Sequence, residues 1–446
     1  MRKTDKLALL IVVILFGFGF SINFISTSLF PPPPADESIH RVILISIDSG
    51  NPEYLSADMM PKLYSEIMAR GAKFKNALTA LAAETQQGHT SMLTGAYPNS
   101  TGIIGNGYYD NSTGKTTAVV LNESYRLAET IIEALDRTNP SLKTAFLSGK
   151  WRLPPLLSNT SDLVFTSSYA EKASGIPFPV PPGYEEKLGR PLEYLGGDLV
   201  DVWVMNALIE VIRTDDPEFI FVNLAGTDDI GHYSGGVGDY SSMIRRQLRE
   251  LDNLFMRLFT ELRAIGEFDN TLFAITADHG MTTIEDIIDM QTYMDSRGIG
   301  CHIHAEGGSG FVYLDNSADL NTAVGALQEH PDVVVVVPYT NYSQYPYNLD
   351  MNITRVGHIY FSTRAHTVLS LHAEGLGNIP VNAVGAHGGI AEQDILMAWM
   401  GPNITRMGYE IPIVPHVADV VPTICHIMGW TAPNNVDGRI LYEIIE

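Results

Sequence analysis

The chain has 446 residues, of which 45% are hydrophobic and 18% charged, so it is long enough for a large ordered domain with a smaller insertion. Its 51 acidic and 28 basic residues give a formal net charge of −23. We expect no binding to nucleic-acid duplexes, because that binding needs clustered Lys and Arg to neutralise phosphates. The two cysteines, Cys301 and Cys425, allow at most one disulfide, and their pairing stays open.

The start of the chain predicts a membrane anchor. Residues 1–6 contain three basic side chains, and residues 7–26 form an apolar run long enough to cross a bilayer as a helix. The positive-inside rule makes residues 1–6 a cytoplasmic tail and places the rest of the chain outside the cytoplasm. Residues 27–39 include four consecutive prolines and predict an extended linker. The alternative is a cleaved signal peptide, which would give a secreted protein.

Asn-x-Ser/Thr sequons occur only after the predicted anchor, which agrees with export and predicts a glycoprotein. There are seven of them, at Asn99, Asn111, Asn122, Asn159, Asn341, Asn352 and Asn403.

Apolar runs alternate with amphipathic stretches, which is typical of an α/β fold whose mostly parallel sheet has helices on both faces. The strands that matter most are expected at 41–47, 218–224, 271–277 and 395–399. An aspartate follows each of the first three, namely Asp48, Asp228 and Asp278. Sites in such folds form beyond the carboxyl ends of the strands. The three aspartates therefore predict one shared site.

A change of pattern predicts a small α/β cap insertion at 282–384. Its expected elements are a strand at 311–314, a helix at 320–329 and a strand at 333–337. The catalytic domain would then consist of residues 40–281 and 385–446.

Six candidate metal ligands lie near the expected strand ends: Asp48, Asp228, His232, Asp278, His279 and His387. Asp228 and His232 are four positions apart, a spacing that one helical turn brings together. Asp278 and His279 are adjacent at a strand end, and glycines beside His387 let the backbone bend sharply. Carboxylates and imidazoles suit Zn²⁺ or a similar divalent ion.

Several motifs together resemble one family. The segment TQQGHTSMLTGAYPNSTGIIGN at 85–106 resembles the nucleophile region of the nucleotide pyrophosphatase/phosphodiesterases, which belong to the alkaline phosphatase superfamily. Similar motifs are IDSGNPEYL at 47–55, ADHGM at 277–281 and GAHGG at 385–389. The resemblance implies an alkaline-phosphatase-like three-layer sandwich and a hydrolase of phosphodiester or pyrophosphate bonds that acts on a small phosphorylated substrate.

The resemblance also implies roles for individual residues. Thr85 would be the nucleophile and form a covalent phospho-threonine intermediate, and Asn106 would donate a hydrogen bond to a phosphoryl oxygen. Two Zn²⁺ would be bound, one by Asp228, His232 and His387, the other by Asp48, Asp278, His279 and the Thr85 oxygen. Thr85 is expected to start a helix that runs to about residue 93, whose N-terminus favours phosphate.

The sequence departs from the family at the position after the nucleophile. An aromatic residue that helps to hold the base usually stands there, whereas this chain has Gln86, followed by Gln87 and Gly88 in place of the usual Pro-Asn. A nucleotide substrate is therefore not implied by this segment.

Two alternatives stay open. The first is a hydrolase like phosphonoacetate hydrolase, which the segment SGKWRLPPLL at 148–157 resembles. This resemblance implies that Lys150 and Arg152 hold the carboxylate of a phosphonate and that the enzyme cleaves a C–P bond. The other alternative is a non-catalytic surface glycoprotein on the same fold, which the complete ligand set argues against.

Overall fold

A computed structural model describes residues 39–166, 180–188, 198–236, 242–344, 349, 353–369 and 384–445. The predicted cytoplasmic tail, the predicted anchor at 7–26 and nearly all of the linker lie outside these residues. Within the described part of the chain, no helix combines the length and the apolar character needed to cross a bilayer. The anchor therefore stays a prediction.

The central sheet has eight strands in the order β20-β2-β19-β9-β1-β8-β6-β7. Their bounds are β1 Arg41–Ile47, β2 Gly71–Phe74, β6 Thr144–Ser148, β7 Leu163–Thr166, β8 Phe219–Leu224, β9 Thr271–Thr276, β19 Met397–Met400 and β20 Glu410–Ile411. β1 pairs in parallel with both β8 and β9, so Val42 lies opposite Phe219 and Leu272. β19 is antiparallel to its neighbours β9 and β2, which makes the sheet mixed.

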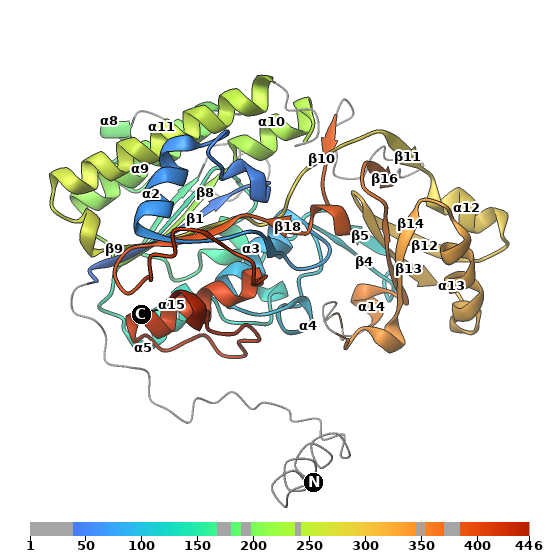
Figure 1. Cartoon of the computed structure of the whole chain (residues 1–446). Helices are drawn as coiled ribbons and strands as arrows, with labels where there is room; N and C mark the ends of the chain where they lie inside the picture. Colours follow the sequence, from blue (N-terminus) through green and yellow to red (C-terminus); the bar gives the residue numbers. More distant parts are fainter. Residues whose placement is uncertain are drawn as a thin grey trace, which may run out of the picture. The chain divides into compact units, whose positions relative to one another are not determined.

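The three central strands consist mainly of apolar residues because helices cover both faces of the sheet. Every residue of β1, β8 and β9 is buried. One helical layer contains α2 (Pro61–Arg70), α9 (Asp198–Thr214), α10 (Gly226–Ser234) and α11 (Ser242–Ala264). The other contains α3 (Thr85–Thr94), α5 (Ile131–Thr138) and α15 (Val420–Met428) (Figure 1). The expected α/β fold is thus confirmed.

The expected strands agree with the structure except at 395–399. β1 coincides with its prediction, β8 starts one residue later, and β9 ends one residue earlier. The fourth expected strand is divided between β18 (Asp394–Ile395), which pairs with β3 (Ala77–Leu78), and β19. The division falls at Leu396, whose N–H donates to the carbonyl oxygen of Gly50 at 2.9 Å instead of joining either ladder.

A second, four-stranded sheet lies within the predicted insertion, with the order β12-β13-β15-β14. Its strands are β12 Cys301–Glu306, β13 Ser309–Leu314, β14 Val333–Pro338 and β15 Ile359–Thr363. Helices α12 (Met290–Ser296) and α13 (Leu320–Glu329) pack on it, and together they form a separate apolar core (Figure 1). α13 coincides with the expected helix, while the boundaries at 282 and 384 stay predictions.

Short elements connect these parts. They are β4 Tyr108–Asp110, β5 Lys115–Thr117, β10 Thr282–Thr283, β11 Asp286–Ile288, β16 Thr367–Leu369, β17 Gly385–Ala386, α4 Pro98–Thr101, α6 Pro154–Leu157, α8 Glu185–Leu188 and α14 Ile353–Val356. β10 pairs with β17, so the chain enters and leaves the second sheet at neighbouring points. Both cysteines are free thiols.

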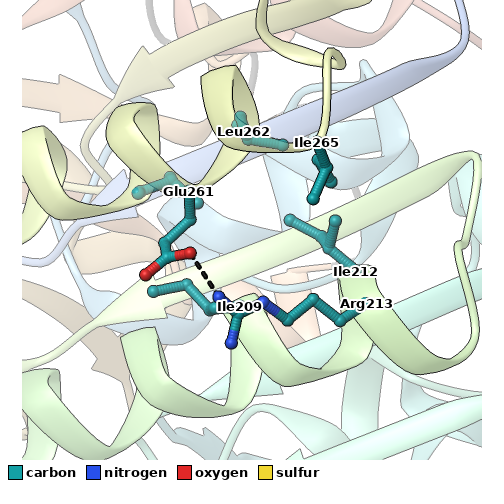
Figure 2. Close-up of a pocket in the computed structure, with 7 residues that line it drawn as sticks. Ile209, Ile212, Arg213, Glu261, Leu262 and Ile265 are labelled. Atoms are coloured by element: carbon teal, nitrogen blue, oxygen red, sulfur yellow. Dashed lines mark hydrogen bonds and ion pairs between the residues drawn. The ribbon is translucent and has the colours of Figure 1, made fainter.

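A pocket lies between the C-terminal parts of α9 and α11, and none of its lining residues is at the carboxyl end of a central strand (Figure 2). Its lining consists of Ile209, Ile212, Arg213, Leu258, Glu261, Leu262 and Ile265. Arg213 and Glu261 form an ion pair across it, and the other side chains are apolar. This lining offers no nucleophile or metal-ligand set, so the candidate site is elsewhere.

Candidate active site

The three predicted aspartates meet at the carboxyl ends of the central strands. Asp48 follows β1 directly, Asp278 follows β9 after one residue, and Asp228 lies in the first turn of α10, which follows β8. Because β1 lies between β8 and β9, their carboxyl ends are side by side. All three carboxylates are buried, with at most 1% of each residue exposed. The structure therefore brings them together, as expected.

Two groups of three side chains could each hold a metal ion. Within each group, the ligand atoms lie within 4.8 Å of one another. One group is Asp228, His279 and His387, and the other is Asp48, His89 and Asp278. This grouping differs from the expected one, which placed His279 with Asp48 and Asp278 and did not include His89.

His279 lies between the two groups. Its Nε2 atom is 3.2 Å from Asp278 Oδ2 and 3.7 Å from Asp48 Oδ1. Its ring stacks on the ring of His387, with the centroids 3.7 Å apart. The imidazole is thus within reach of the ligand atoms of either group.

His232 lies one helical turn after Asp228 in α10, as its spacing predicts. Its Nε2 atom is 3.5 Å from Asp228 Oδ1, while its Nδ1 atom lies 3.0 Å from the carbonyl oxygen of Gly385. The backbone contact at Nδ1 leaves Nε2 facing the carboxylate, which is the arrangement that holds a metal-binding histidine in place.

Thr85 is the first residue of α3 and is buried. Its Oγ1 atom lies 3.2 Å from His279 Nε2, so the candidate nucleophile adjoins the carboxylate and imidazole cluster. The expected helix start at Thr85 agrees with the structure, and the helix ends one residue later than expected.

Asn106 and Gln86 are fixed by hydrogen bonds. Asn106 Oδ1 accepts from the backbone N–H of Gln86 at 3.0 Å, and its Nδ2 donates to Glu84. The Gln86 side chain is fully buried and bonds the backbone of Val120 through both of its polar atoms. Gln86 therefore connects α3 to a neighbouring loop and is not free to hold a base.

Lys150 and Arg152 lie beside the cluster. Lys150 Nζ donates to Asp228, and lies 3.7 Å from Asp48 Oδ1 and 3.8 Å from Asp229 Oδ1. The Nε atom of Arg152 is buried and makes no hydrogen bond with any residue that the structure describes. The lysine thus neutralises part of the buried negative charge, and the guanidinium retains a free donor.

Burial and crowding shift the acidities of the cluster in different directions. Burial and the adjacent Asp278 raise the pKa of Asp48 to about 8. Burial also raises the pKa of Asp278, but His279 and His89 outweigh it, and the net value is about 2. Burial lowers the pKa of His279 to about 3. Carboxylates that are buried close together favour a cation among them.

The donor set fits a divalent metal. Asp48 Oδ1 and Asp278 Oδ2 are buried oxygens that form no hydrogen bond with the described part of the chain. Buried polar atoms normally have a partner, so two such oxygens facing imidazole nitrogens fit a cation bound between them. Carboxylate oxygen and imidazole nitrogen are the ligands that Zn²⁺ accepts.

Sequence reasoning missed several residues that touch this cluster. His89 Nδ1 lies 3.2 Å from Asp278 Oδ2 and 2.8 Å from the carbonyl oxygen of Thr85. Ser49 Oγ donates to Asp228 Oδ1 at 2.6 Å from a backbone with φ of 61°, which is uncommon outside glycine. The spacing of four between Thr85 and His89 was a usable signal, whereas Ser49 lies within the IDSGNPEYL motif but nothing in the sequence indicated its contact with Asp228.

Comparison with known proteins decides the family. The profile of the family described as type I phosphodiesterase / nucleotide pyrophosphatase matches residues 42–389. The chain belongs to this family. It is accordingly a phosphoric ester hydrolase, as the sequence motifs predicted.

Relatives and solved structures agree with this assignment. The chain is 24% identical over 418 residues to bis(5'-adenosyl)-triphosphatase enpp4 of Mus musculus, covering 90% of this chain and 80% of the relative. Murine ectonucleotide pyrophosphatase / phosphodiesterase 5 matches with a TM-score of 0.69 at 17% identity, covering 91% of this chain and 100% of that one. Alkaline phosphatase PafA matches with a TM-score of 0.72 at 18% identity, covering 93% and 99%. The alkaline-phosphatase-like fold is thus confirmed.

Proposed function

We propose that this protein is a metal-dependent hydrolase of phosphodiester or pyrophosphate bonds, with Thr85 as the nucleophile. The observation that carries the proposal is the Thr85 hydroxyl, which lies 3.2 Å from His279 inside a buried cluster of carboxylates and imidazoles. Membership of the phosphodiesterase family supports the reaction class. The name of the enpp4 relative and the solved complex of murine phosphodiesterase 5 with AMP support a nucleotide-derived substrate.

Seven side chains would hold two zinc ions. The proposed set is Asp48, Thr85, Asp228, His232, Asp278, His279 and His387, and the position of His279 between the two groups allows it to serve either ion. When bound, the metals supply Lewis acidity and neutralise the charge of the reacting phosphoryl group.

The residues of the chain perform the remaining steps. Thr85 Oγ1, reacting as an alkoxide, attacks phosphorus, the bond to the leaving oxygen breaks, and a phospho-threonine forms. Water then displaces Thr85 from phosphorus. The free N–H of the Asn106 amide donates to a phosphoryl oxygen, and the N-terminus of α3 favours the negative charge there.

Replacing the nucleophile tests this mechanism. We expect Thr85→Ala to reduce kcat/KM for bis(p-nitrophenyl) phosphate by at least about a thousandfold, because the covalent route is lost. Thr94→Ala is the matched control, since Thr94 is buried in the same helix and, among the described residues, its hydroxyl bonds only backbone groups, Thr90 O at 2.7 Å and Ala96 N at 3.2 Å. Comparable activity in both variants would refute the role of Thr85.

Hydrolysis of phosphate monoesters is a second candidate. A solved variant of alkaline phosphatase PafA has a threonine, an asparagine, a lysine and an arginine substituted. Thr85 and Asn106 are as far apart in this sequence as the first pair is in PafA, and the spacing of Lys150 and Arg152 equals that of the second pair. Two cations beside the cluster would offset the extra charge of a dianionic monoester.

A substrate panel distinguishes the candidates. We expect the wild type to hydrolyse bis(p-nitrophenyl) phosphate and nucleotide pyrophosphates faster than p-nitrophenyl phosphate or phosphonoacetate. If Lys150 and Arg152 bind substrate oxygens, Arg152→Ala lowers kcat/KM for the monoester more than for the diester. A clear preference of the wild type for p-nitrophenyl phosphate would favour the second candidate, and activity confined to phosphonoacetate would refute both.

We also propose that the catalytic domain lies outside the cytoplasm, anchored through residues 7–26. The word ectonucleotide in the names of relatives supports this location. Six of the sequon asparagines in the described part of the chain are not buried and can be tested for glycans together. Asn111, Asn122 and Asn159 are exposed, and Asn99, Asn341 and Asn403 are partly exposed.

A further inference from the structure

Glu84 directly precedes Thr85, and its carboxylate is buried, with 2% of the residue exposed. It occupies the N-cap position of α3, where an acidic side chain commonly accepts hydrogen bonds from the first turn of the helix. The Glu84 side chain makes no such bond. A buried carboxylate that does not cap its own helix must be stabilised by other partners, because burying an unpaired charge is costly.

Its two oxygens contact two residues that come from different parts of the chain. Oε1 lies 3.4 Å from Nδ1 of His387, and Oε2 accepts a hydrogen bond from Nδ2 of Asn106. The loop around His387 leaves room for the carboxylate, because a Cβ at Gly388 would lie 2.7 Å from Glu84 Oε1. One carboxylate therefore joins a candidate metal ligand to the candidate phosphoryl donor.

The contact with His387 determines which ring nitrogen faces the cluster. His387 Nδ1 lies near Glu84 and 3.2 Å from the carbonyl oxygen of Ala83, so it is the nitrogen placed to donate to these oxygens. Nε2 is therefore the nitrogen that faces the cluster, and it lies 3.7 Å from Asp228 Oδ1. Metal-binding histidines are commonly oriented by a carboxylate or carbonyl at the other nitrogen, and loss of that partner costs metal affinity.

The contact with Asn106 holds the amide in one orientation. Asn106 Oδ1 accepts from Gln86 N, and one of its two N–H groups donates to Glu84. An amide bonded at both ends does not flip, so the second N–H stays available for a phosphoryl oxygen.

We propose that Glu84 is a positioning residue that orients His387 for metal binding and Asn106 for phosphoryl binding at the same time. The inference rests on the proposed function, because it takes His387 as a metal ligand and Asn106 as the donor to the substrate. It adds a residue that touches neither the metal nor the substrate but sets the geometry of both contacts.

Zinc affinity and phosphate affinity of the full-length protein test the two contacts separately. Zinc affinity is measured by competition with a chromogenic chelator, and phosphate affinity by inhibition with inorganic phosphate at saturating zinc. We expect Glu84→Ala to weaken zinc binding by about 10- to 100-fold and to weaken phosphate binding as well. Glu84→Gln should fall between the wild type and Glu84→Ala, since its single amide oxygen can accept from only one of the two partners.

A double variant shows whether the effect on phosphate passes through Asn106. In the Asn106→Ala background, Glu84→Ala should cause no further loss of phosphate affinity at saturating zinc. If Glu84→Ala weakens phosphate binding as much in the Asn106→Ala background as in the wild type, this half of the proposal is overturned. Unchanged zinc affinity in Glu84→Ala would overturn the other half, because the Ala83 carbonyl alone would then hold His387.

Asp252 provides the matched control. It is also a buried carboxylate, and it accepts from the backbone N–H groups of Lys62 and Leu63 in α2, away from the cluster. Asp252→Ala should lower the melting temperature without changing either affinity. If Glu84→Ala does not fold, Glu84→Gln is used instead, and its affinities for zinc and phosphate must then differ from those of the wild type. A wild type that binds no divalent metal would refute the proposed function itself, whereas wild-type affinities in the Glu84 variants would refute only the role of Glu84.

Discussion

At Gly88, the helix that carries the candidate nucleophile passes very close to the segment that carries a candidate ligand. A Cβ atom at this position would lie 2.2 Å from the carbonyl oxygen of Asp278, a distance that no side chain tolerates. Thr85 and His89 flank this contact in the same helix. The glycine that replaces a larger residue of the family pattern therefore permits the close approach of α3 to Asp278.

We expect Gly88→Ala to destabilise the protein by about 1–3 kcal/mol and to reduce hydrolysis, because α3 must move away from Asp278. Gly325→Ala is the control. Gly325 lies within α13 and a Cβ there would meet nothing within 4 Å, so alanine should stabilise the protein by roughly 0.5–1 kcal/mol. Denaturant unfolding measures both changes. Equal midpoints for Gly88→Ala and the wild type would contradict the close contact.

At the scale of one element, α5 begins where a reciprocal pair of hydrogen bonds places it. The Thr130 hydroxyl oxygen accepts from the backbone N–H of Glu133 at 3.2 Å, and the Glu133 carboxylate accepts from the N–H of Thr130 at 2.7 Å. Arg126 binds the same carboxylate through two bonds of 2.8 and 2.7 Å. Burial raises the pKa of Glu133, but Arg126 and Thr130 lower it more, so the pKa lies below its usual value.

This pair predicts a pH dependence of stability. Because the folded pKa of Glu133 is depressed, its stabilising contribution is complete above the unfolded value of about 4.5 and is lost as the pH falls through the folded pKa. Glu133→Gln should therefore cost about 1 kcal/mol at pH 7 and progressively less below pH 4.5. The exposed Glu123, changed to Gln, serves as control. A constant difference in unfolding free energy across this pH range would contradict the pairing.

At the scale of the whole catalytic part, the second sheet contributes to the site. The turn between β12 and β13 packs against the His387 loop, where Gly308 N donates to the carbonyl oxygen of His387 at 3.1 Å. Gly307 has φ of 55°, and a Cβ on it would lie 1.8 Å from the same oxygen. The predicted insertion thus contacts the backbone of His387, a candidate ligand, and helps to fix its position, in addition to any role as a cap.

The buried carboxylates and imidazoles should make stability depend on metal. A ligand present at a thousand times its Kd stabilises the folded state by about 4 kcal/mol. We therefore expect a chelator to abolish hydrolysis and to lower the melting temperature, and added Zn²⁺ to restore both. Metal analysis of protein purified without chelator should find close to two zinc per chain. A chelated protein with unchanged activity and melting temperature would refute the metal site.

Local patterns in the sequence were sufficient to predict several strands and helices and the position of the candidate site. The apolar, β-branched run at 41–47 predicted β1, and the periodic pattern at 320–329 predicted α13, because burial on a strand or on one helix face leaves a regular signature. Asp48, Asp228 and Asp278 could be placed together from sequence, since parallel strands have their carboxyl ends at one edge of the sheet. The family motifs then indicated the reaction class.

Only the tertiary structure showed the contacts that cross the chain. The contact between His387 Nδ1 and the Ala83 carbonyl joins residues 304 positions apart, and the contacts of Glu84 with His387 and of Ser49 with Asp228 are also non-local. The position of His279 between two ligand groups depends on how the loop after β9 packs against the His387 loop. Such contacts leave no periodic trace in sequence, because they are determined by the packing of whole elements rather than by the conformation of any one of them.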